Sequence, residues 1–202
     1  MQRIAIAVAS IALLLAAVSA SAQEGLGEVS VQGTGFFTKD SNGRGTFQRG
    51  TESGGLLVGY RRQLYRWISA EAVYGYSRNT QQFFQPTGVA RVQSNIHEAT
   101  GGFVVKLPFI AGIRPYALAE GGALVFAPTR NAFGGIPGAD REVAGVFVYG
   151  GGVDYPFLSS HLLLRAEYRG LVYHAPDFGL GSLDTDAVTH TAQPSAGVVF
   201  HF

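Results

Sequence analysis

The last twelve residues of the chain, TAQPSAGVVFHF, constrain the fold more than any other stretch. Every second residue is apolar, in the row Pro194, Ala196, Val198, Phe200 and Phe202. The intervening row is small and mostly polar: Gln193, Ser195, Gly197, Val199 and His201. A two-residue period is the period of a β-strand. Residues 191–202 are therefore predicted to form a strand with one apolar face, and the chain stops on the phenylalanine itself.

The first residues of the chain read as an export leader. Arg3 is followed by an apolar run over residues 4–18, and Ala20-Ser21-Ala22 matches the small-residue pattern of a cleavage site. The run is too short for a membrane-spanning helix. We therefore expect a signal peptide over residues 1–22 that is cleaved before Gln23, and one domain over residues 23–202.

The composition of this domain excludes several classes of protein. Apart from Arg3, the chain has fourteen basic and fourteen acidic residues, so no excess of positive charge points to nucleic acid. Cysteine is absent, which excludes disulfides and thiolate metal sites. The 28 glycines disfavour helices, because each costs a helix about 1 kcal/mol. No apolar run after the leader approaches the roughly 20 residues that a membrane-spanning helix needs.

Seven further segments alternate in the same way as the last one. They cover approximately residues 28–37, 53–61, 68–77, 98–107, 114–125, 143–155 and 162–172. The connections between them are alternately long and short, which is typical of outer-membrane barrels. A sheet in hydrocarbon can leave no open edge, so the last strand is expected to pair with the first. The prediction is an all-β, eight-stranded, antiparallel up-and-down transmembrane β-barrel.

The charged residues of these strands all share one face. That face carries Glu28, Arg61, Glu71, Glu98, Lys106, Arg114, Glu120, Asp154, Arg165, Glu167 and Arg169. A lipid-facing Arg or Lys at the membrane midplane costs about 2 to 4 kcal/mol, which explains the segregation physically. A soluble barrel of the lipocalin kind has the inverse arrangement, with an apolar interior. Together with the leader, the charge pattern favours a membrane barrel with its charges inside.

Five of these inward charges are expected near mid-height: Glu71, Glu120, Arg165, Glu167 and Arg169. The interior of an eight-stranded barrel is just wide enough for side chains to fill it. We expect these residues to form an ion-pair network in which Arg165 pairs with Glu71 or Glu120. The network has two interpretations, a structural plug of the lumen or a gate that opens a narrow ion path.

Aromatic residues are expected in two girdles at the membrane interfaces. The girdle beside the short turns would contain Tyr65, Trp67, Phe109, Tyr155, Phe157, Phe200 and Phe202. The girdle beside the long loops would contain Phe36, Phe37, Tyr74, Tyr76, Phe126 and Tyr173.

The leader, the eight strands, the ending VVFHF and the segment RAEYR over residues 165–169 resemble the small outer-membrane β-barrel superfamily. That superfamily includes the transmembrane domain of OmpA and the OmpX type. The resemblance implies a Gram-negative outer membrane, contact with its lipid and lipopolysaccharide, and an assembly signal at Phe202 and Phe200 read by the barrel-assembly machinery. The periplasmic peptidoglycan-binding domain of OmpA has no counterpart here, so wall anchoring is not expected.

The functional prediction is a structural or surface-interaction barrel with no cofactor and no catalysis, with a narrow porin-like channel as the alternative. An extracellular ligand would meet the long loops, which are the usual recognition sites on a rigid scaffold. The loops contain four apolar side chains that either contact such a ligand or fold back on the rim: Phe83, Phe84, Phe133 and Phe178.

Two chemical alternatives rest on weaker patterns. A lipid-modifying enzyme of the deacylase type would carry His-x-Ser on one strand, which is absent, and His161 follows Ser159 and Ser160 in an expected turn. A metal site in the last loop would use His174, Asp177, Asp184, Asp186 and His190, but their spacing is not that of an EF-hand. The prediction is therefore no enzyme and no metal.

Overall fold

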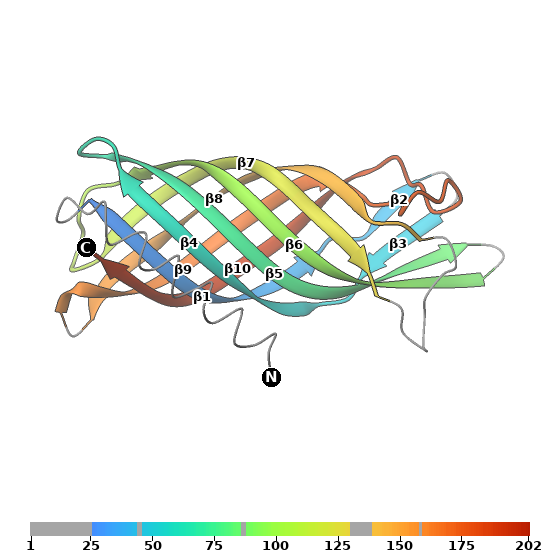
Figure 1. Cartoon of the computed structure of the whole chain (residues 1–202), viewed down its shortest axis with the longest axis horizontal. Helices are drawn as coiled ribbons and strands as arrows, with labels where there is room; N and C mark the ends of the chain where they lie inside the picture. Colours follow the sequence, from blue (N-terminus) through green and yellow to red (C-terminus); the bar gives the residue numbers. More distant parts are fainter. Residues whose placement is uncertain (1–25, 44–45, 86–87, 130–138, 158) are drawn as a thin grey trace, which may run out of the picture.

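The computed structural model of the chain describes residues 26–43, 46–85, 88–129, 139–157 and 159–202. The expected leader over residues 1–22 and the loop residue Phe133 lie outside these ranges. The described chain forms one elongated barrel of tilted strands (Figure 1). It contains no helix that could span a membrane.

The wall of the barrel consists of eight long strands. They are β1 (Gly27–Thr38), β4 (Ser53–Gln63), β5 (Ile68–Gln85), β6 (Gly88–Lys106), β7 (Arg114–Pro128), β8 (Glu142–Phe157), β9 (Ser159–His174) and β10 (Val188–His201). Each strand pairs antiparallel with its neighbour along the wall, and β10 pairs with β1 in a register that places Val198 opposite Val31. The predicted closed eight-stranded barrel is therefore confirmed for the described part of the chain.

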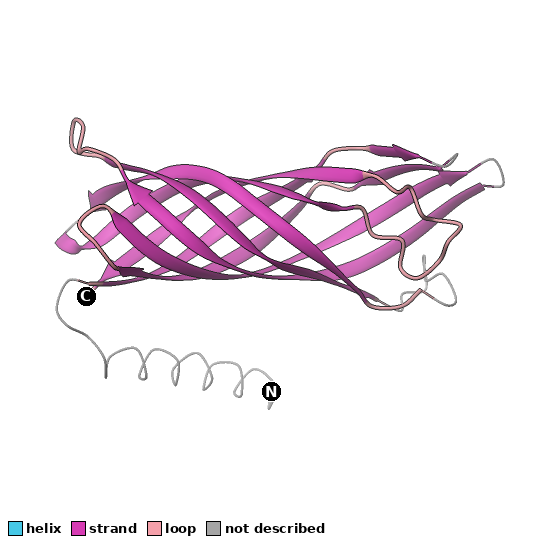
Figure 2. Cartoon of the chain, turned by 90° about the horizontal axis from the view of Figure 1, so that it is seen from above, coloured by secondary structure: helices cyan, strands magenta, loops and turns pink. Residues whose placement is uncertain are grey.

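The two ends of the barrel differ, and we call them the turn end and the loop end. At the turn end the short connections join β4 to β5, β6 to β7 and β8 to β9. At the loop end the connections are long, and one of them holds a short hairpin of β2 (Ser41–Gly43) and β3 (Thr46–Gly50). Figure 2 shows the strands extending as a wall at this end, with irregular loops beside them.

The second long loop expected from the sequence is mostly strand, so that prediction was wrong. Strands β5 and β6 stay paired as far as Gln85 and Gly88, well beyond the predicted strand ends at residues 77 and 98. Strand β3 adds to the same wall by pairing with β5. The extension was missed because strands outside the membrane have no need of an apolar face, and their alternation is weak there.

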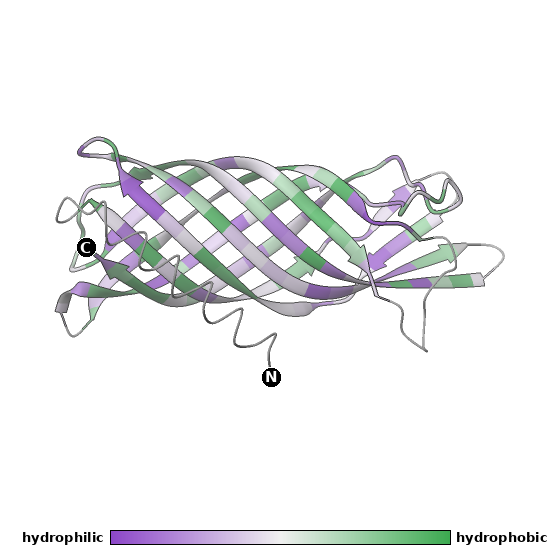
Figure 3. Cartoon of the chain, viewed as in Figure 1, coloured by the Kyte–Doolittle hydropathy of each residue, from purple (hydrophilic) through white to green (hydrophobic). Residues whose placement is uncertain are grey.

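Hydrophobic and hydrophilic residues alternate along the strands (Figure 3). The outer surface carries exposed aromatic side chains toward both ends. At the turn end these are Tyr65, Trp67, Phe109, Tyr155, Phe157 and Phe200. Toward the loop end they are Phe37, Tyr74, Tyr76, Phe147 and Tyr149. Three members predicted for the loop-end girdle were wrong, since Phe36, Phe126 and Tyr173 are buried in the lumen. The two-residue period of their strands continues to the strand ends and turns all three inward.

The interior has a charged part and an apolar part. Nine of the eleven charges predicted to face inward are buried: Glu28, Arg61, Glu71, Glu98, Glu120, Asp154, Arg165, Glu167 and Arg169. Lys106 is half-buried and Arg114 is exposed at the turn-end rim. Toward the loop end the lumen is filled instead by an apolar cluster that includes Phe36, Phe83, Val92, Phe126, Tyr173, Phe178 and Leu183. We call these seven residues the apolar plug.

Candidate functional site

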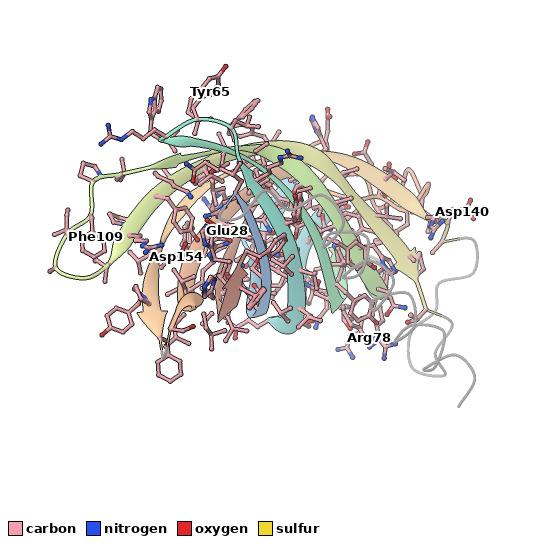
Figure 4. All side chains as sticks on the ribbon, turned by 60° about the vertical axis from the view of Figure 1, so that its left-hand side comes forward. Glu28, Tyr65, Arg78, Phe109, Asp140 and Asp154 are labelled. Carbon is pink, nitrogen blue, oxygen red and sulfur yellow. The ribbon has the colours of Figure 1, made fainter. Side chains whose placement is uncertain are left out.

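The charged lumen begins near the turn end with two buried arginines, Arg61 and Arg165. Arg61 donates two hydrogen bonds to the Glu71 carboxylate, at 3.1 and 3.0 Å. Arg165 donates to both oxygens of Asp154, at 2.7 and 2.8 Å, and to Glu28 Oε2 at 3.1 Å. Figure 4 shows Glu28 and Asp154 inside the ring of strands. Two cations thus bind three carboxylates from three different strands, β1, β5 and β8, which ties non-neighbouring strands of the barrel together.

Strand register determines which charges meet in this group. Arg61 lies opposite Glu71 in the β4–β5 ladder, and Arg165 lies opposite Asp154 in the β8–β9 ladder. Side chains directly opposite each other on one face of an antiparallel pair are about 4.5 to 5.5 Å apart at Cβ, so such pairs form readily. The contact from Arg165 to Glu28 has a different origin, because β9 and β1 are separated by β10 and the contact crosses the lumen.

One aromatic ring lies against both of these guanidinium groups. The central guanidinium carbons of Arg61 and Arg165 lie 4.3 and 5.1 Å from the centroid of the Tyr116 ring. Both distances are within the range of cation–π attraction. The Tyr116 hydroxyl donates a 2.6 Å hydrogen bond to Glu167 Oε2, and Glu167 also lies 3.8 Å from Arg61. Tyr116 therefore contacts both cations through its ring and a fourth carboxylate through its hydroxyl.

A second charged group lies farther along the lumen around Arg169. Its guanidinium nitrogens lie 3.0 Å from Glu98 Oε1 and 2.6 Å from Glu120 Oε2. Thr100 donates a hydrogen bond to Glu120 at 2.8 Å, and Gln193 donates one to Glu98 at 2.9 Å. One cation is therefore shared by two carboxylates, each of which receives a further hydrogen bond.

The five residues predicted for the network fall into both groups. Arg165 Nη1 lies 3.6 Å from Glu71 Oε1, but its shorter contacts are to Asp154 and Glu28. Glu120 belongs to the second group and contacts Arg169 instead. Asp154 and Glu28 were left out of the group expected near mid-height, because height was counted along each strand. The strands are tilted, so residues at different counts from the turns meet across the lumen.

Carboxylates outnumber cations among the described lumen residues. The carboxylates are Glu28, Glu71, Glu98, Glu120, Asp154 and Glu167, and the cations are Arg61, Lys106, Arg165 and Arg169. Lys106 lies nearest the rim and contacts Glu28 at 3.1 Å. Removing a single cation from such a buried group leaves carboxylates without a partner, which costs far more than removing one of the surplus carboxylates.

The apolar plug is completed by the last long loop, which folds back into the loop end. Phe178 is fully buried and meets the rings of Phe83 and Phe126 edge-on, with centroids 6.3 and 6.4 Å apart. Phe83, which lies on β5, and Phe178 of the last loop thus both point inward. Phe84 is half-exposed on the outside and packs on Phe47 at 5.8 Å.

A half-buried carboxylate holds this loop in place. The backbone N–H of Phe178 donates a 2.6 Å hydrogen bond to Glu142 Oε2, and the Asp140 N–H donates to the Phe178 carbonyl at 3.0 Å. Phe178 has φ of 56°, a left-handed conformation that is uncommon for a bulky side chain. Glu142 lies at the first residue of β8, beyond the membrane belt. Partial burial raises the pKa of its carboxyl, and the hydrogen bond from Phe178 opposes that shift.

The residues considered for metal binding or catalysis have local partners. Asp177 and Asp184 accept hydrogen bonds from the backbone N–H groups of Gly179 and Asp186, at 2.8 and 2.7 Å. Among the described residues no group of three or more His, Asp or Glu is placed to hold a metal ion. Ser159 Oγ accepts hydrogen bonds from the backbone N–H groups at residues 161 and 162, so its partners are main-chain groups.

The predicted assembly signal lies at the seam where the barrel closes. The backbones of Phe202 and Gly27 exchange two hydrogen bonds of 2.9 and 3.0 Å. The rings of Phe200 and Phe202 stack at 6.1 Å between centroids. The last residue of the chain is thus paired to the first residue of β1.

A closed antiparallel barrel with an apolar, aromatic-edged outer surface and a charged interior defines an integral outer-membrane protein, because only a closed sheet satisfies its backbone in hydrocarbon. The sequence agrees with this class. The chain belongs to the outer membrane protein beta-barrel domain family, whose sequence model matches residues 8–202.

Solved structures show the same fold at low sequence identity. Neisserial surface protein A is 12% identical, with a TM-score of 0.57, over 87% of this chain and 97% of that one. The outer membrane protein AlkL is 13% identical, with a TM-score of 0.52, over 89% and 90%. The attachment invasion locus protein Ail of Yersinia pestis, in complex with the heparin analogue sucrose octasulfate, is 18% identical, with a TM-score of 0.49, over 88% and 100%. No curated protein matches the sequence.

Proposed function

We propose that this protein is a surface-interaction barrel whose lumen is closed and whose loop-end wall is presented outside the cell. Export would use the signal peptide over residues 1–22, and insertion would use the terminal strand with Phe200 and Phe202 as its recognised residues. The proposal assigns the protein no catalytic activity and no cofactor. Family membership supports the location, and the geometry of the lumen supports the closed state.

One observation carries the proposal: Phe178, contributed by the last loop, is fully buried between Phe83 and Phe126 at the loop end of the lumen. Below it the two arginine-centred groups fill the remaining height. An ion entering from outside would meet an apolar layer first and paired charges second. Such an interior suits a rigid support for external recognition better than a pore.

The recognition surface in this proposal is the wall formed by β3, β5 and β6 beyond the membrane. Its paired strands hold side chains in a fixed spacing, which costs less conformational entropy on binding than a flexible loop. The printed titles of the similar structures include a surface protein and an attachment protein. A role in binding an extracellular ligand is consistent with both.

A gated channel is the second candidate, and one feature favours it. Arg165 lies within 3.6 Å of three different carboxylates, Glu28, Glu71 and Asp154. A cation with several alternative partners can exchange among them without becoming unpaired. If Arg165 moved toward one of them, a narrow path would open beside it, provided that the Phe178 loop also withdrew.

The proposal is tested by shortening the wall while leaving the barrel intact. Residues 84–89 are replaced by an Asn-Gly turn, because Phe83 and Ala90 are already paired and a two-residue turn closes such a hairpin, while Phe83 and Val92 of the apolar plug are kept. Bacteria displaying the natural and shortened proteins are then compared for adhesion to extracellular-matrix proteins and glycans. The control replaces Arg62 and Arg66, at the opposite end, with Gln.

The natural protein and the control are expected to adhere, and the shortened protein is expected to lose adhesion while still showing heat-modifiable migration on a gel. Equal adhesion of the shortened and natural proteins would contradict recognition through this wall. Adhesion by none of the three, combined with regular ion conductance of the natural protein, would favour the channel instead.

A further inference from the structure

The outer face of the extended wall is cationic, a feature that the proposed function does not use. Arg78 of β5 and Arg91 of β6 point outward and are exposed, and Arg49 of β3 lies on the same face. The register places Gln82 opposite both Arg49 and Arg91, so these two arginines lie at one level on either side of a glutamine. Arg78 lies four residues before Gln82 on the same face of β5. We call Arg49, Arg78 and Arg91 together the arginine row.

No acidic residue balances the central part of this face. Between residues 77 and 97 the sequence contains Arg78 and Arg91 but no Asp or Glu. Among the described residues, neither arginine forms an ion pair. Arg78 Nε donates a 2.9 Å hydrogen bond to Asn95 Oδ1, an amide that carries no charge. Arg49 differs, because Asp40 lies 3.0 Å from it. Arg78 and Arg91 therefore provide two unbalanced positive charges on one exposed sheet face.

The height of these charges relates them to the membrane. Arg78 follows the exposed Tyr76 by two residues on the same face of β5, and Tyr76 also donates a hydrogen bond to Asn95 at 3.2 Å. With a rise of about 3.4 Å per residue and a tilt near 40°, Arg78 lies about 5 Å beyond the tyrosines, and the level of Arg91 about 15 Å beyond them. Interfacial tyrosines mark the edge of the hydrocarbon. The arginines therefore lie at the level of the lipid headgroups and just above them, and Figure 4 shows Arg78 on the outside of the strands.

A hollow beside Arg49 extends the same surface. Its volume is about 750 Å³, and it opens between the loop ends of β1 and β10 and strand β3. Phe37 and Ala192 form its lipid-facing part, while Lys39 and His190 line it farther out, together with Asp40 and Glu52. Apolar and charged groups thus occur together in this hollow.

We infer that the arginine row binds the phosphate groups of lipopolysaccharide in the outer leaflet. Guanidinium groups form paired, charge-assisted hydrogen bonds with phosphate, and two outward arginines at successive heights match an anionic glycolipid whose charges lie above its acyl chains. This occupant is favoured over a soluble sulfated glycan because of where the arginines lie. They are on the outer face of the wall, and they begin directly above the exposed tyrosines that mark the edge of the hydrocarbon. The inference rests on the proposed placement of the loop end outside the cell, but not on recognition of an extracellular ligand there.

The test uses the full mature chain, purified in detergent and titrated with fluorescent lipopolysaccharide. The natural protein is compared with a double variant, Arg78→Gln with Arg91→Gln, and with a matched control, Arg62→Gln with Arg66→Gln. The control removes two exposed arginines at the turn end, where no lipopolysaccharide lies. Each protein is also titrated with lipopolysaccharide whose phosphates have been removed by a phosphatase. Heat-modifiable migration on a gel reports folding.

The double variant is expected to bind phosphorylated lipopolysaccharide about 10- to 30-fold more weakly than the natural protein, since each cation near a charged membrane surface contributes appreciably to binding. The control should bind as the natural protein does, and dephosphorylation should remove the difference between variants. Equal affinity of all three proteins, or an equal loss in both double variants, would overturn the inference. So would arginine-dependent binding of heparin without binding of phosphorylated lipopolysaccharide.

The natural protein alone provides a second measurement that does not depend on variant folding. Its affinity should fall when the phosphates are removed and should weaken as the salt concentration rises. An affinity that is unchanged by dephosphorylation would overturn the inference, whatever the behaviour of the variants.

Discussion

Arg169 of β9 and Glu120 of β7 meet inside the barrel, with Nη2 2.6 Å from Oε2 and both side chains inaccessible to solvent. Their strands are not neighbours in the wall, because β8 lies between them. The contact therefore bridges the lumen and is not a cross-strand pair within one ladder. Arg169 also contacts Glu98 of β6, so a single guanidinium connects three strands.

This sharing predicts an asymmetry between the two partners. Arg169→Gln leaves Glu98 and Glu120 without a cation, and we expect it to lower the free energy of unfolding by about 3 to 5 kcal/mol. Glu120→Gln leaves Arg169 paired with Glu98 and removes a surplus negative charge, so its cost should be about 1 kcal/mol or less. Urea unfolding in lipid vesicles measures both. Equal costs, or a larger cost for Glu120→Gln, would contradict a shared cation.

The apolar plug predicts a specific effect of truncating Phe178. Phe178→Ala leaves a cavity between Phe83 and Phe126, and truncation of a buried phenylalanine costs about 3 to 5 kcal/mol where the site cannot collapse. Release of the loop should offset part of that cost. Limited proteolysis of the loop between β9 and β10 measures this release. The control is Phe84→Ala, whose ring packs on the outside. If the loop is cleaved at the same rate in both variants, Phe178 does not hold it.

Glu142 predicts a pH dependence for the same loop. Its pKa is raised in the folded protein, so the folded state binds a proton at higher pH than the unfolded state, whose pKa lies near 4.5. The charged form therefore costs stability above the folded pKa, and that cost disappears as the pH falls toward 4.5. Glu142→Gln imitates the neutral acid. We expect the variant to be at least as stable as the natural protein at pH 7, with the difference shrinking at lower pH. A difference that widens as the pH falls would show that the pKa is lowered instead.

Two adjacent glycines of β7 provide a matched test of close packing between strands. A Cβ at Gly122 would meet the carbonyl oxygen of Ala99 and the Cα of Thr100 at 2.7 Å, whereas a Cβ at Gly121 meets nothing within 4 Å. Gly122→Ala should therefore destabilise the barrel by about 1 to 3 kcal/mol or prevent its insertion. Gly121→Ala, on the lipid-facing side, should be tolerated. Unfolding in lipid vesicles distinguishes them, and equal behaviour of the two variants would contradict the close approach of β6 and β7.

The strand period determined how much of the fold could be predicted. It assigned eleven charges on seven strands to the inner face, of which nine are buried, and it identified β10 as the strand that closes on β1. The same rule assigns Phe36, Phe126 and Tyr173 to the lumen, and the girdle prediction failed where residue type was allowed to override it. The extension of β5 and β6 left no apolar signal, because both of its faces lie outside the membrane.

The partners within the lumen were harder to predict than the residues that face it. Arg165 pairs mainly with Asp154 because of the β8–β9 register, and with Glu28 because of strand tilt. Neither quantity can be read from one strand at a time. The buried position of Phe178 could be predicted only from the path of the whole loop. Its neighbours Asp177 and Gly179 indicate only a turn.

The central claim is that the lumen is closed along its height, and single-channel recording of the folded natural protein in a planar bilayer tests it most directly. The account predicts no reproducible conductance steps, because the Phe178 layer and the arginine-centred groups leave no continuous aqueous path. Arg165→Ala and Glu71→Ala are then expected to lower stability without creating regular steps. Reproducible steps in the natural protein, altered by either substitution, would contradict the closed lumen and establish the charged groups as a gate.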